Sequence, residues 1–317
     1  MKKVLAVYYS QTGQLSSVVK SICAPLEAKE GIEVTYECLQ PVKAYPFPWS
    51  LFQFFDVFPE SVYLDPPPLQ PLSSAAEQDY DLILISYQVW FLSPSLPITA
   101  FMKSEQGKRL LKGKPVITII ACRNMWLMAQ EKMKQLIKEA NARLLDNITL
   151  IDSSNSLLTF ITTPRWLLTG NKGRSDGWLP VAGVSQDEIK ASKRFGHALT
   201  SSLEQGQEKG DGPLLHGLRA VTVNPSLIPS EKIGTRSFMI WGKLLRRVGK
   251  PGSVTRKPVL FIYVIFLISL IISVVPLTML LRTLFRPLMK RRLAIQQKYF
   301  EQPSGSAETR LAEFPHD

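Results

Sequence analysis

Patterns typical of buried strands and of amphipathic helices alternate along residues 1–205, and this alternation restricts the possible fold more than any other feature. Continuous apolar runs, as expected for strands buried on both faces, are followed by stretches such as Gln14–Lys29, in which apolar residues recur on one helical face. Five strands separated by helices predict an α/β domain with a doubly wound, five-stranded parallel sheet. The predicted strands are Lys3–Tyr9, Ile32–Cys38, Leu82–Tyr87, Pro115–Cys122 and Ile148–Asp152.

Further helices are predicted at Pro97–Ser104, Leu127–Leu144 and Ser185–Gln205, the last opened by a capping box. Two insertions, residues 41–72 and 155–184, interrupt the alternation. Long insertions in compact domains are usually functional. The first contains eight prolines and an aromatic cluster. We expect its Trp49–Phe58 part to form a lid or an acyl-chain groove, with a packed crossover segment as the alternative.

The first predicted strand opens directly into a short polar loop that precedes a helix. Hydroxyl groups and the free N–H groups at a helix start can bind one phosphate, and glycine lets the backbone approach it closely. The loop has neither the Gly-Lys-Ser/Thr of a nucleotide-triphosphate loop nor a G-x-G-x-x-G motif. A phosphate loop is therefore predicted, and an ordinary capped turn is the alternative. Its residues are Ser10, Gln11, Thr12, Gly13 and Gln14.

Two more loops follow strands at the carboxyl edge of the predicted sheet, where doubly wound folds bind their ligands. Both bring aromatic and amide groups, which suit the flat ring and the polar edge of a flavin. Either tryptophan can instead pack into the core. Tyr87, Arg123 and His197 are proton-transfer candidates by residue type alone. The predicted ring-binding residues are Gln88, Val89, Trp90 and Phe91 in one loop, and Arg123, Asn124, Met125 and Trp126 in the other.

Basic residues gather in one part of the chain. The net charge is +12, yet residues 236–298 hold 13 Lys/Arg and no acidic residue, so the remainder has 25 basic and 26 acidic residues. The basic segment surrounds the uncharged run Val259–Leu281, which favours an anionic membrane surface over nucleic acid as the partner. We expect a linker (206–235), a basic amphipathic segment (236–257), a transmembrane helix (258–282) kinked at Pro276, and a basic then polar tail (283–317), disordered from Gln302 on.

The N-terminus has no signal-peptide pattern, so the flavin domain is expected on the cytoplasmic side of the cytoplasmic membrane. Six basic residues lie on each side of the apolar run, so the positive-inside rule gives no orientation. One tilted crossing is favoured by length over a re-entrant or interfacial helix. The three cysteines and three histidines are too dispersed to suggest a disulfide framework or a metal site.

Residues 1–205 resemble the flavodoxin-like superfamily, which includes flavodoxins, quinone reductases and FMN reductases. Residues 9–13 resemble its phosphate loop, Tyr87–Pro97 its loop against the flavin ring, and residues 122–126 its third flavin loop. Leu15 departs from the further hydroxyls that flavodoxins favour near this position. The resemblance implies FMN as the cofactor. FAD is less favoured because no second nucleotide-binding motif is visible.

The whole chain resembles bacterial proteins known as dialkylresorcinol condensing enzymes, in the YYSQTGQL start, the FPWSLFQFFDVFPE and TPRWLLTG segments and the membrane-associated C-terminus. This resemblance implies an apolar acyl-derived substrate and a ketosynthase of the same pathway as a partner. Condensation needs a nucleophilic cysteine with histidine partners, and the sequence has no such motif. Oxidation of a cyclic dione to a resorcinol by FMN fits the residues better. The alternatives are an electron carrier or quinone reductase serving a membrane partner, and a scaffold without flavin.

Overall fold

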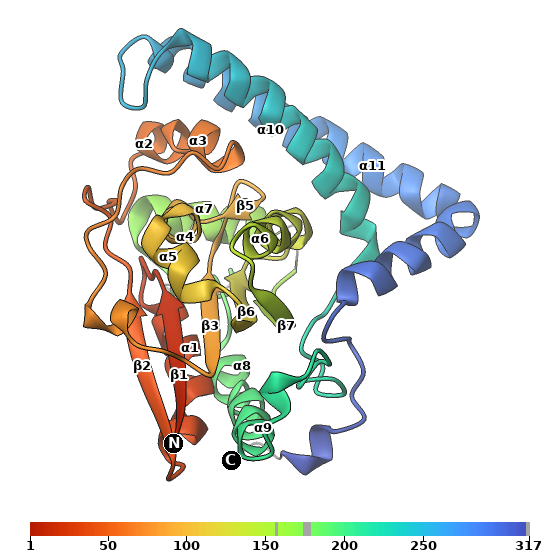
Figure 1. The fold of residues 1–317 in the computed structure, drawn as a ribbon. Helices are drawn as coiled ribbons and strands as arrows, with labels where there is room; N and C mark the ends of the chain where they lie inside the picture. Colours follow the sequence, from red (N-terminus) through yellow and green to blue (C-terminus); the bar gives the residue numbers. More distant parts are fainter. Residues whose placement is uncertain (156–157, 174–178, 315–317) are drawn as a thin grey trace.

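The computed structural model describes residues 1–155, 158–173 and 179–314. Its main sheet has five strands, all parallel, in the order β2-β1-β3-β6-β7 (Figure 1). In this order the chain winds outward from β1 in both directions, which is the flavodoxin-like arrangement. The fold is flavodoxin-like, as predicted. The strands are β1 (Lys2–Tyr8), β2 (Ile32–Cys38), β3 (Leu82–Tyr87), β6 (Pro115–Cys122) and β7 (Arg143–Ile151).

Helices cover both faces of this sheet because its strands are apolar on both sides. Alternate residues of β1 enter different cores: Val4 and Ala6 pack with α1 (Gln14–Glu27), whereas Leu5 and Val7 face the opposite side. The first face also carries α8 (Gln186–Ala191) and α9 (Lys193–Glu204), and the second carries α4 (Leu96–Lys103), α5 (Glu105–Leu111) and α6 (Leu127–Glu139).

Two predicted helices have different limits in the structure. Helix α6 ends at Glu139 rather than at Leu144, because Asn141 adopts a left-handed conformation (φ 57°) and Arg143 already pairs with Pro115 of β6. The predicted helix Ser185–Gln205 is divided into α8 and α9. Its predicted cap is confirmed, since the Ser185 hydroxyl accepts a hydrogen bond from the backbone N–H of Glu188.

The two insertions form short helices at the carboxyl edge of the sheet. The first contains α2 (Leu51–Asp56) and α3 (Phe58–Val62), and the second contains α7 (Thr159–Thr169). The 3₁₀ turn η1 (Ser74–Glu77) follows the first insertion and leads to β3. Residues 156–157 and 174–178 of the second insertion lie outside the described residues. A small antiparallel hairpin, β4 (Val89–Trp90) and β5 (Ser93–Pro94), follows β3 and was not predicted.

The prediction of a linker at residues 206–235 is wrong. After the 3₁₀ turn η2 (Gln207–Lys209), Leu215 and Leu218 enter the core, and the N–H groups of Leu214 and Leu215 donate to the carboxylate of Asp146 in β7. Burial raises the pKa of Asp146 to about 6. The segment covers the edge of the sheet with apolar side chains. A flexible linker would leave that edge exposed.

The expectation of a disordered tail from Gln302 on is also wrong for the residues that the structure describes. The Ser304 hydroxyl is buried and accepts a hydrogen bond of 2.6 Å from the backbone N–H of Asn147 in β7. The N–H of Arg219 donates to Ala307 O and that of Arg310 to Gly217 O. A last 3₁₀ turn, η4, spans Leu311–Glu313. The polar tail docks because it forms hydrogen bonds with backbone groups at an edge strand that would otherwise lack partners.

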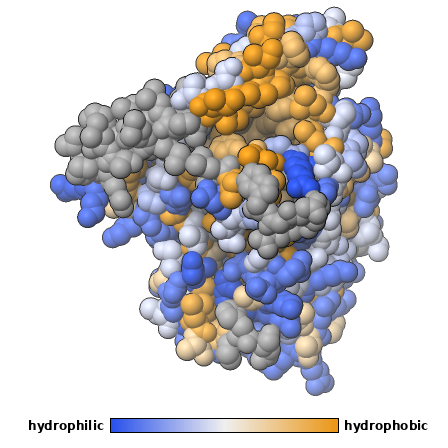
Figure 2. All heavy atoms as spheres, turned by 180° about the vertical axis from the view of Figure 1, so that it is seen from behind, coloured by the Kyte–Doolittle hydropathy of each residue, from blue (hydrophilic) through white to orange (hydrophobic). Residues whose placement is uncertain are grey.

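The 3₁₀ turn η3 (Pro225–Leu227) leads into two long helices, α10 (Ile228–Val248) and α11 (Arg256–Glu301), which form a hairpin beside the sheet domain. Helix α11 first follows α10 and then turns back toward the sheet domain (Figure 1). By length and composition, Arg256–Ser273 is apolar enough to cross a membrane. However, the tail beyond α11 is docked on β7, so a single crossing at 258–282 is incompatible with this structure. Apolar side chains gather on the hairpin's side of the molecule (Figure 2).

Candidate functional site

A cavity of about 170 Å³ lies at the carboxyl edge of the sheet, next to the point between β1 and β3 where the winding reverses. Doubly wound sheets bind their ligands at this position, because the loops after neighbouring strands diverge there. All five strands contribute a following loop or insertion to the wall. The lining residues are Gln11, Thr12, Gln14, Leu15, Trp49, Phe54, Val57, Gln88, Val89, Trp90, Phe91, Ala121, Cys122, Arg123, Asp152, Thr163, Trp166, Leu167 and Gly183.

The predicted phosphate loop has the backbone geometry that such a site needs. Gly13 precedes α1 in a left-handed conformation (φ 80°), and a Cβ at this position would meet nothing within 4 Å. The first N–H groups of α1 lack intrahelical partners. The Ser10 hydroxyl accepts the N–H of Ser16 at 3.3 Å and thereby shapes the turn. Thr12 lines the cavity, whereas Ser10 and Gly13 do not.

The two glutamines of this loop hold the insertions in place. Gln11 donates to Pro46 O (2.7 Å) and accepts from the indole N–H of Trp49 (3.1 Å). Gln14 forms a pair of hydrogen bonds with the backbone of Val184. Both side-chain amides are therefore occupied by protein partners, and the loop's remaining groups for an anion are backbone N–H groups and the Thr12 hydroxyl.

Aromatic rings form the wall over the cavity. Trp90 lies 5.9 Å from Trp49 and 5.0 Å from Tyr45, measured between ring centroids, and both contacts are edge-to-face. Phe91 and Leu92, with φ values of 49° and 56°, join β4 to β5. A two-residue connection of this kind requires positive φ at both positions. The turn directs Phe91 against Phe54 at a centroid distance of 5.0 Å.

Charged groups meet inside this aromatic enclosure. The guanidinium of Arg123 lies 4.1 Å from the ring centroid of Phe160, and burial lowers the pKa of Arg123 to about 10, so it is cationic at neutral pH. The Asp152 carboxylate, also in the wall, accepts the N–H groups of Ser154 (2.9 Å) and Gly183 (2.8 Å). Gln88 Oε1 is buried and has no hydrogen-bond partner among the described residues.

Several residues predicted for the site lie elsewhere. Of the third loop, only Arg123 lines the cavity; Asn124 and Met125 do not, and Trp126 is buried in the core below α6. Tyr87 is also in the core, where its hydroxyl donates to Gln130 Oε1 at 2.6 Å.

His197 lies on the exposed face of α9 and does not line the cavity. Tyr87 and His197 therefore lie outside the cavity, and the structure gives no support for a proton-transfer role of either. The cofactor-binding roles of the other residues stay predictions.

Sequence reasoning missed Asp152, Thr163, Trp166 and Gly183. Asp152 follows the fifth strand in the same way that Arg123 follows the fourth, so the carboxyl-edge rule applied to every strand would have found it. The others come from the second insertion, whose position over the cavity depends on the Gln14–Val184 hydrogen bonds. No sequence pattern indicates that contact.

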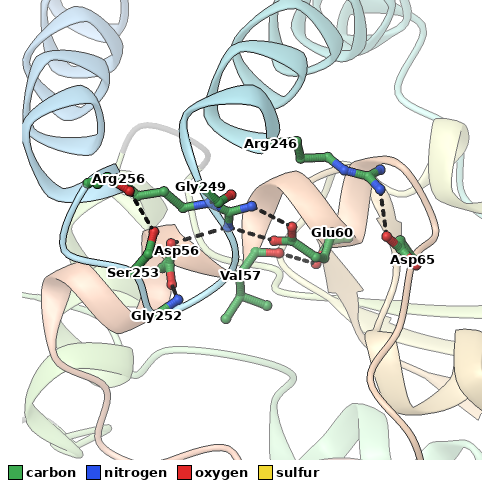
Figure 3. Close-up of polar contacts among 11 residues, drawn as sticks. Asp56, Val57, Glu60, Asp65, Arg246, Gly249, Gly252, Ser253 and Arg256 are labelled. Atoms are coloured by element: carbon green, nitrogen blue, oxygen red, sulfur yellow. Dashed lines mark hydrogen bonds and ion pairs between the residues drawn. The ribbon is translucent and has the colours of Figure 1, made fainter.

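Helices α2 and α3, called the lid helices below, are fastened to the helical hairpin by ion pairs (Figure 3). Phe54 of α2 and Val57, which lies between the two helices, belong to the cavity wall. Arg256 is 1% exposed and binds Glu60 through two bonds, Nη2–Oε1 at 2.8 Å and Nη1–Oε2 at 3.1 Å. Its Nε donates to Gly249 O at 2.8 Å, and Nη1 lies 3.4 Å from Asp56. A second pair, Arg246–Asp65 at 2.6 Å, is solvent-exposed.

The chemical groups around the cavity are of the types that FMN needs. The loop offers backbone donors for a phosphate, the wall offers aromatic surface for the ring, and Gln88 offers an unpaired acceptor for a ring N–H. The cavity is smaller than the roughly 300–1,000 Å³ of ordinary ligand pockets. The cavity therefore has to widen to admit a tricyclic ring.

No protein-family model and no curated protein match the chain. Among solved structures, a flavoprotein from Lactobacillus acidophilus in complex with FMN is 18% identical over 47% of this chain and 93% of its own, with a TM-score of 0.38. An archaeal flavodoxin is 12% identical over 64% of this chain and 99% of its own (TM-score 0.35). An NADH:FMN oxidoreductase in its apo form is 10% identical over 50% and 79% (TM-score 0.33). TM-scores this low carry no argument about activity, and the fold assignment rests on the strand order of the sheet.

Proposed function

We propose that this chain is a membrane-associated, FMN-dependent oxidoreductase that aromatises an acyl-derived cyclic dione to a dialkylresorcinol. The observation that carries the proposal is a cationic Arg123 beside Asp152 in an aromatic cavity next to a phosphate-type loop. The family resemblance of the sequence supplies the substrate class.

The reaction removes two hydrogens from the dione ring. When bound, FMN supplies a two-electron acceptor that takes up a hydride. The substrate loses that hydride from one ring carbon and a proton from the neighbouring carbon, and the resulting double bond completes the aromatic ring. Asp152 is the cavity carboxylate suited to receive the proton.

Arg123 has a separate role. A cyclic 1,3-dione forms an enolate readily, and a buried cation in the cavity wall stabilises such an anion. The aromatic wall and lid exclude water from the reacting carbons. Burial raises the pKa of the Cys122 thiol in the same cavity, so it is not a thiolate at neutral pH, which argues against a condensing role.

The test is aerobic incubation of the detergent-purified, FMN-loaded protein with a dialkylcyclohexanedione, followed by chromatography for the resorcinol. Arg123→Met and Asp152→Asn are expected to lose turnover by at least about a hundred-fold, within the range for general acid–base groups, while keeping bound FMN. Asp211→Asn, at an exposed carboxylate on the sheet's edge, is the matched control. NAD(P)H-dependent reduction of soluble quinones without dione turnover would instead favour a quinone reductase or electron carrier. Failure to bind FMN would remove the basis of the proposal.

A further inference from the structure

We infer that the α10–α11 hairpin is a docking surface for one leaflet of an anionic phospholipid membrane and lies in its plane without crossing it. The inference deepens the membrane part of the proposed function. It does not depend on the flavin or on the reaction.

Both ends of α11 are fixed to the sheet domain. At its beginning, Arg256 is paired with Glu60, and the ring of Tyr263 stacks on Phe58 with centroids 4.5 Å apart (Figure 3 shows the ion pair). At its end, Phe300 is buried in the core and the hydroxyl of Tyr299 donates to Glu131 Oε2 of α6 at 2.7 Å. A helix anchored at both ends on one domain cannot place those ends on opposite sides of a bilayer.

An apolar stripe runs along the outside of the hairpin. The inner faces pack against the lid, through residues such as Gly242 and Tyr263. The outer faces repeat apolar residues at intervals of three, four or seven, which places them on one side of each helix. Ile240 is 71% exposed and Ile272 is 70% exposed. The stripe consists of Ile233, Ile240 and Leu244 on α10, Val254 in the connecting turn, and Phe261, Ile265, Ile268 and Ile272 on α11.

Basic residues border the apolar stripe. Exposed Lys243, Arg247, Lys250 and Lys257 flank the stripe near the turn of the hairpin, and residues 236–298 contain no carboxylate. An amphipathic helix with basic flanks and a bulky aliphatic face binds in the interfacial plane of membranes with anionic lipids. Protein interfaces instead concentrate their binding energy in tryptophan, tyrosine and arginine. The exposed stripe is mainly isoleucine, so a lipid leaflet fits it better than a partner protein.

A buried aromatic cluster connects the inner face of the hairpin to the cavity wall. Phe91 of the cavity wall contacts Phe58 at a centroid distance of 5.6 Å, Phe58 stacks on Tyr263 of α11, and Tyr263 lies 5.4 Å from Trp241 of α10. Docking therefore places the hairpin between the leaflet and the lid helices.

Vesicle co-sedimentation of the full chain tests the docking. The wild type is expected to bind vesicles made of equal parts phosphatidylglycerol and phosphatidylcholine more tightly than pure phosphatidylcholine. Ile240→Glu with Ile265→Glu, and separately Lys243→Glu with Arg247→Glu, should each weaken binding at least tenfold. Val42→Glu, at an exposed apolar residue of the sheet domain, is the matched control. Unchanged binding of both hairpin variants, or no vesicle binding by the wild type, would overturn the inference.

A thiol-labelling experiment tests the side on which the tail lies. Cys38 is exposed on the sheet domain, and Glu308 is exposed in the docked tail. A membrane-impermeant thiol reagent is applied to intact and to lysed spheroplasts expressing wild type, or Glu308→Cys in a Cys38→Ser background. Labelling of both positions under the same condition supports in-plane docking, and labelling of the two from opposite sides refutes it. Neither experiment uses FMN or turnover, so failure here is distinguishable from failure of the proposed reaction.

Discussion

Replacement of Arg256 should release the lid from the hairpin while leaving the sheet folded. Arg256 is 1% exposed and Glu60 is 8% exposed, and the two form a bidentate pair. Arg256→Met keeps the side chain's length but leaves the Glu60 carboxylate buried without its cation. Breaking a buried pair in this way costs roughly 3–5 kcal/mol. The exposed pair Arg246–Asp65 contributes only about 0–1 kcal/mol, so Arg246→Met is the matched control.

Hydrogen exchange followed by mass spectrometry measures this difference locally. A loss of 3–5 kcal/mol corresponds to a rise of about a hundred-fold to several-thousand-fold in the opening equilibrium. We therefore expect amides of α2 and α3 to exchange that much faster in Arg256→Met, with β1 and β3 unchanged. Glu60→Gln combined with Arg256→Met should recover much of the protection, because no buried charge is left unpaired. Equal effects of Arg256→Met and Arg246→Met, or no recovery in the double variant, would refute the reasoning.

Two other predictions concern the phosphate loop and pH. Thr12→Val with Gly13→Val should abolish FMN retention, measured by absorbance after gel filtration, whereas Gly31→Val, which introduces a side chain at another left-handed glycine away from the site, should retain FMN. Burial raises the pKa of Glu231 from 4.5 to about 7, although its carboxylate accepts the N–H of Met128 at 2.9 Å. The folded state therefore holds this proton more tightly, and stability contributed by the protonated form is lost as pH rises from about 4.5 to about 7. Denaturant unfolding of Glu231→Gln should show a gain relative to wild type that grows over this range, and a constant difference would contradict the assignment.

The sequence by itself determined the sheet and the position of the candidate site. Apolar runs such as Leu82–Tyr87 can be satisfied only by burial on both faces, so five of them separated by helices leave few alternatives to a doubly wound sheet. The loop Ser10–Gln14 follows the first strand directly, and its place at the carboxyl edge follows from the parallel topology. These patterns extend over only a few consecutive residues, so they can be recognised in the sequence alone.

Only the tertiary structure decided which side chains reach the cavity. Trp90 and Trp126 have similar sequence surroundings at strand ends, yet one lines the cavity and the other is buried under α6. Asp152 and Arg123 meet because β6 and β7 are neighbours, which is a contact between distant residues. The burial of a side chain depends on what packs over it from elsewhere in the chain, and periodicity contains no such information.

The C-terminal region shows the same limit on a larger scale. Composition correctly located an apolar helix with basic flanks. It did not show that the residues after this helix dock on β7 of the sheet. Ser304 is polar, and its docking on Asn147 depends on the unpaired backbone of an edge strand more than 150 residues earlier. Hydropathy measures what a segment can bury, whereas the choice between crossing a membrane and lying on its surface depends on where both ends of that segment are anchored.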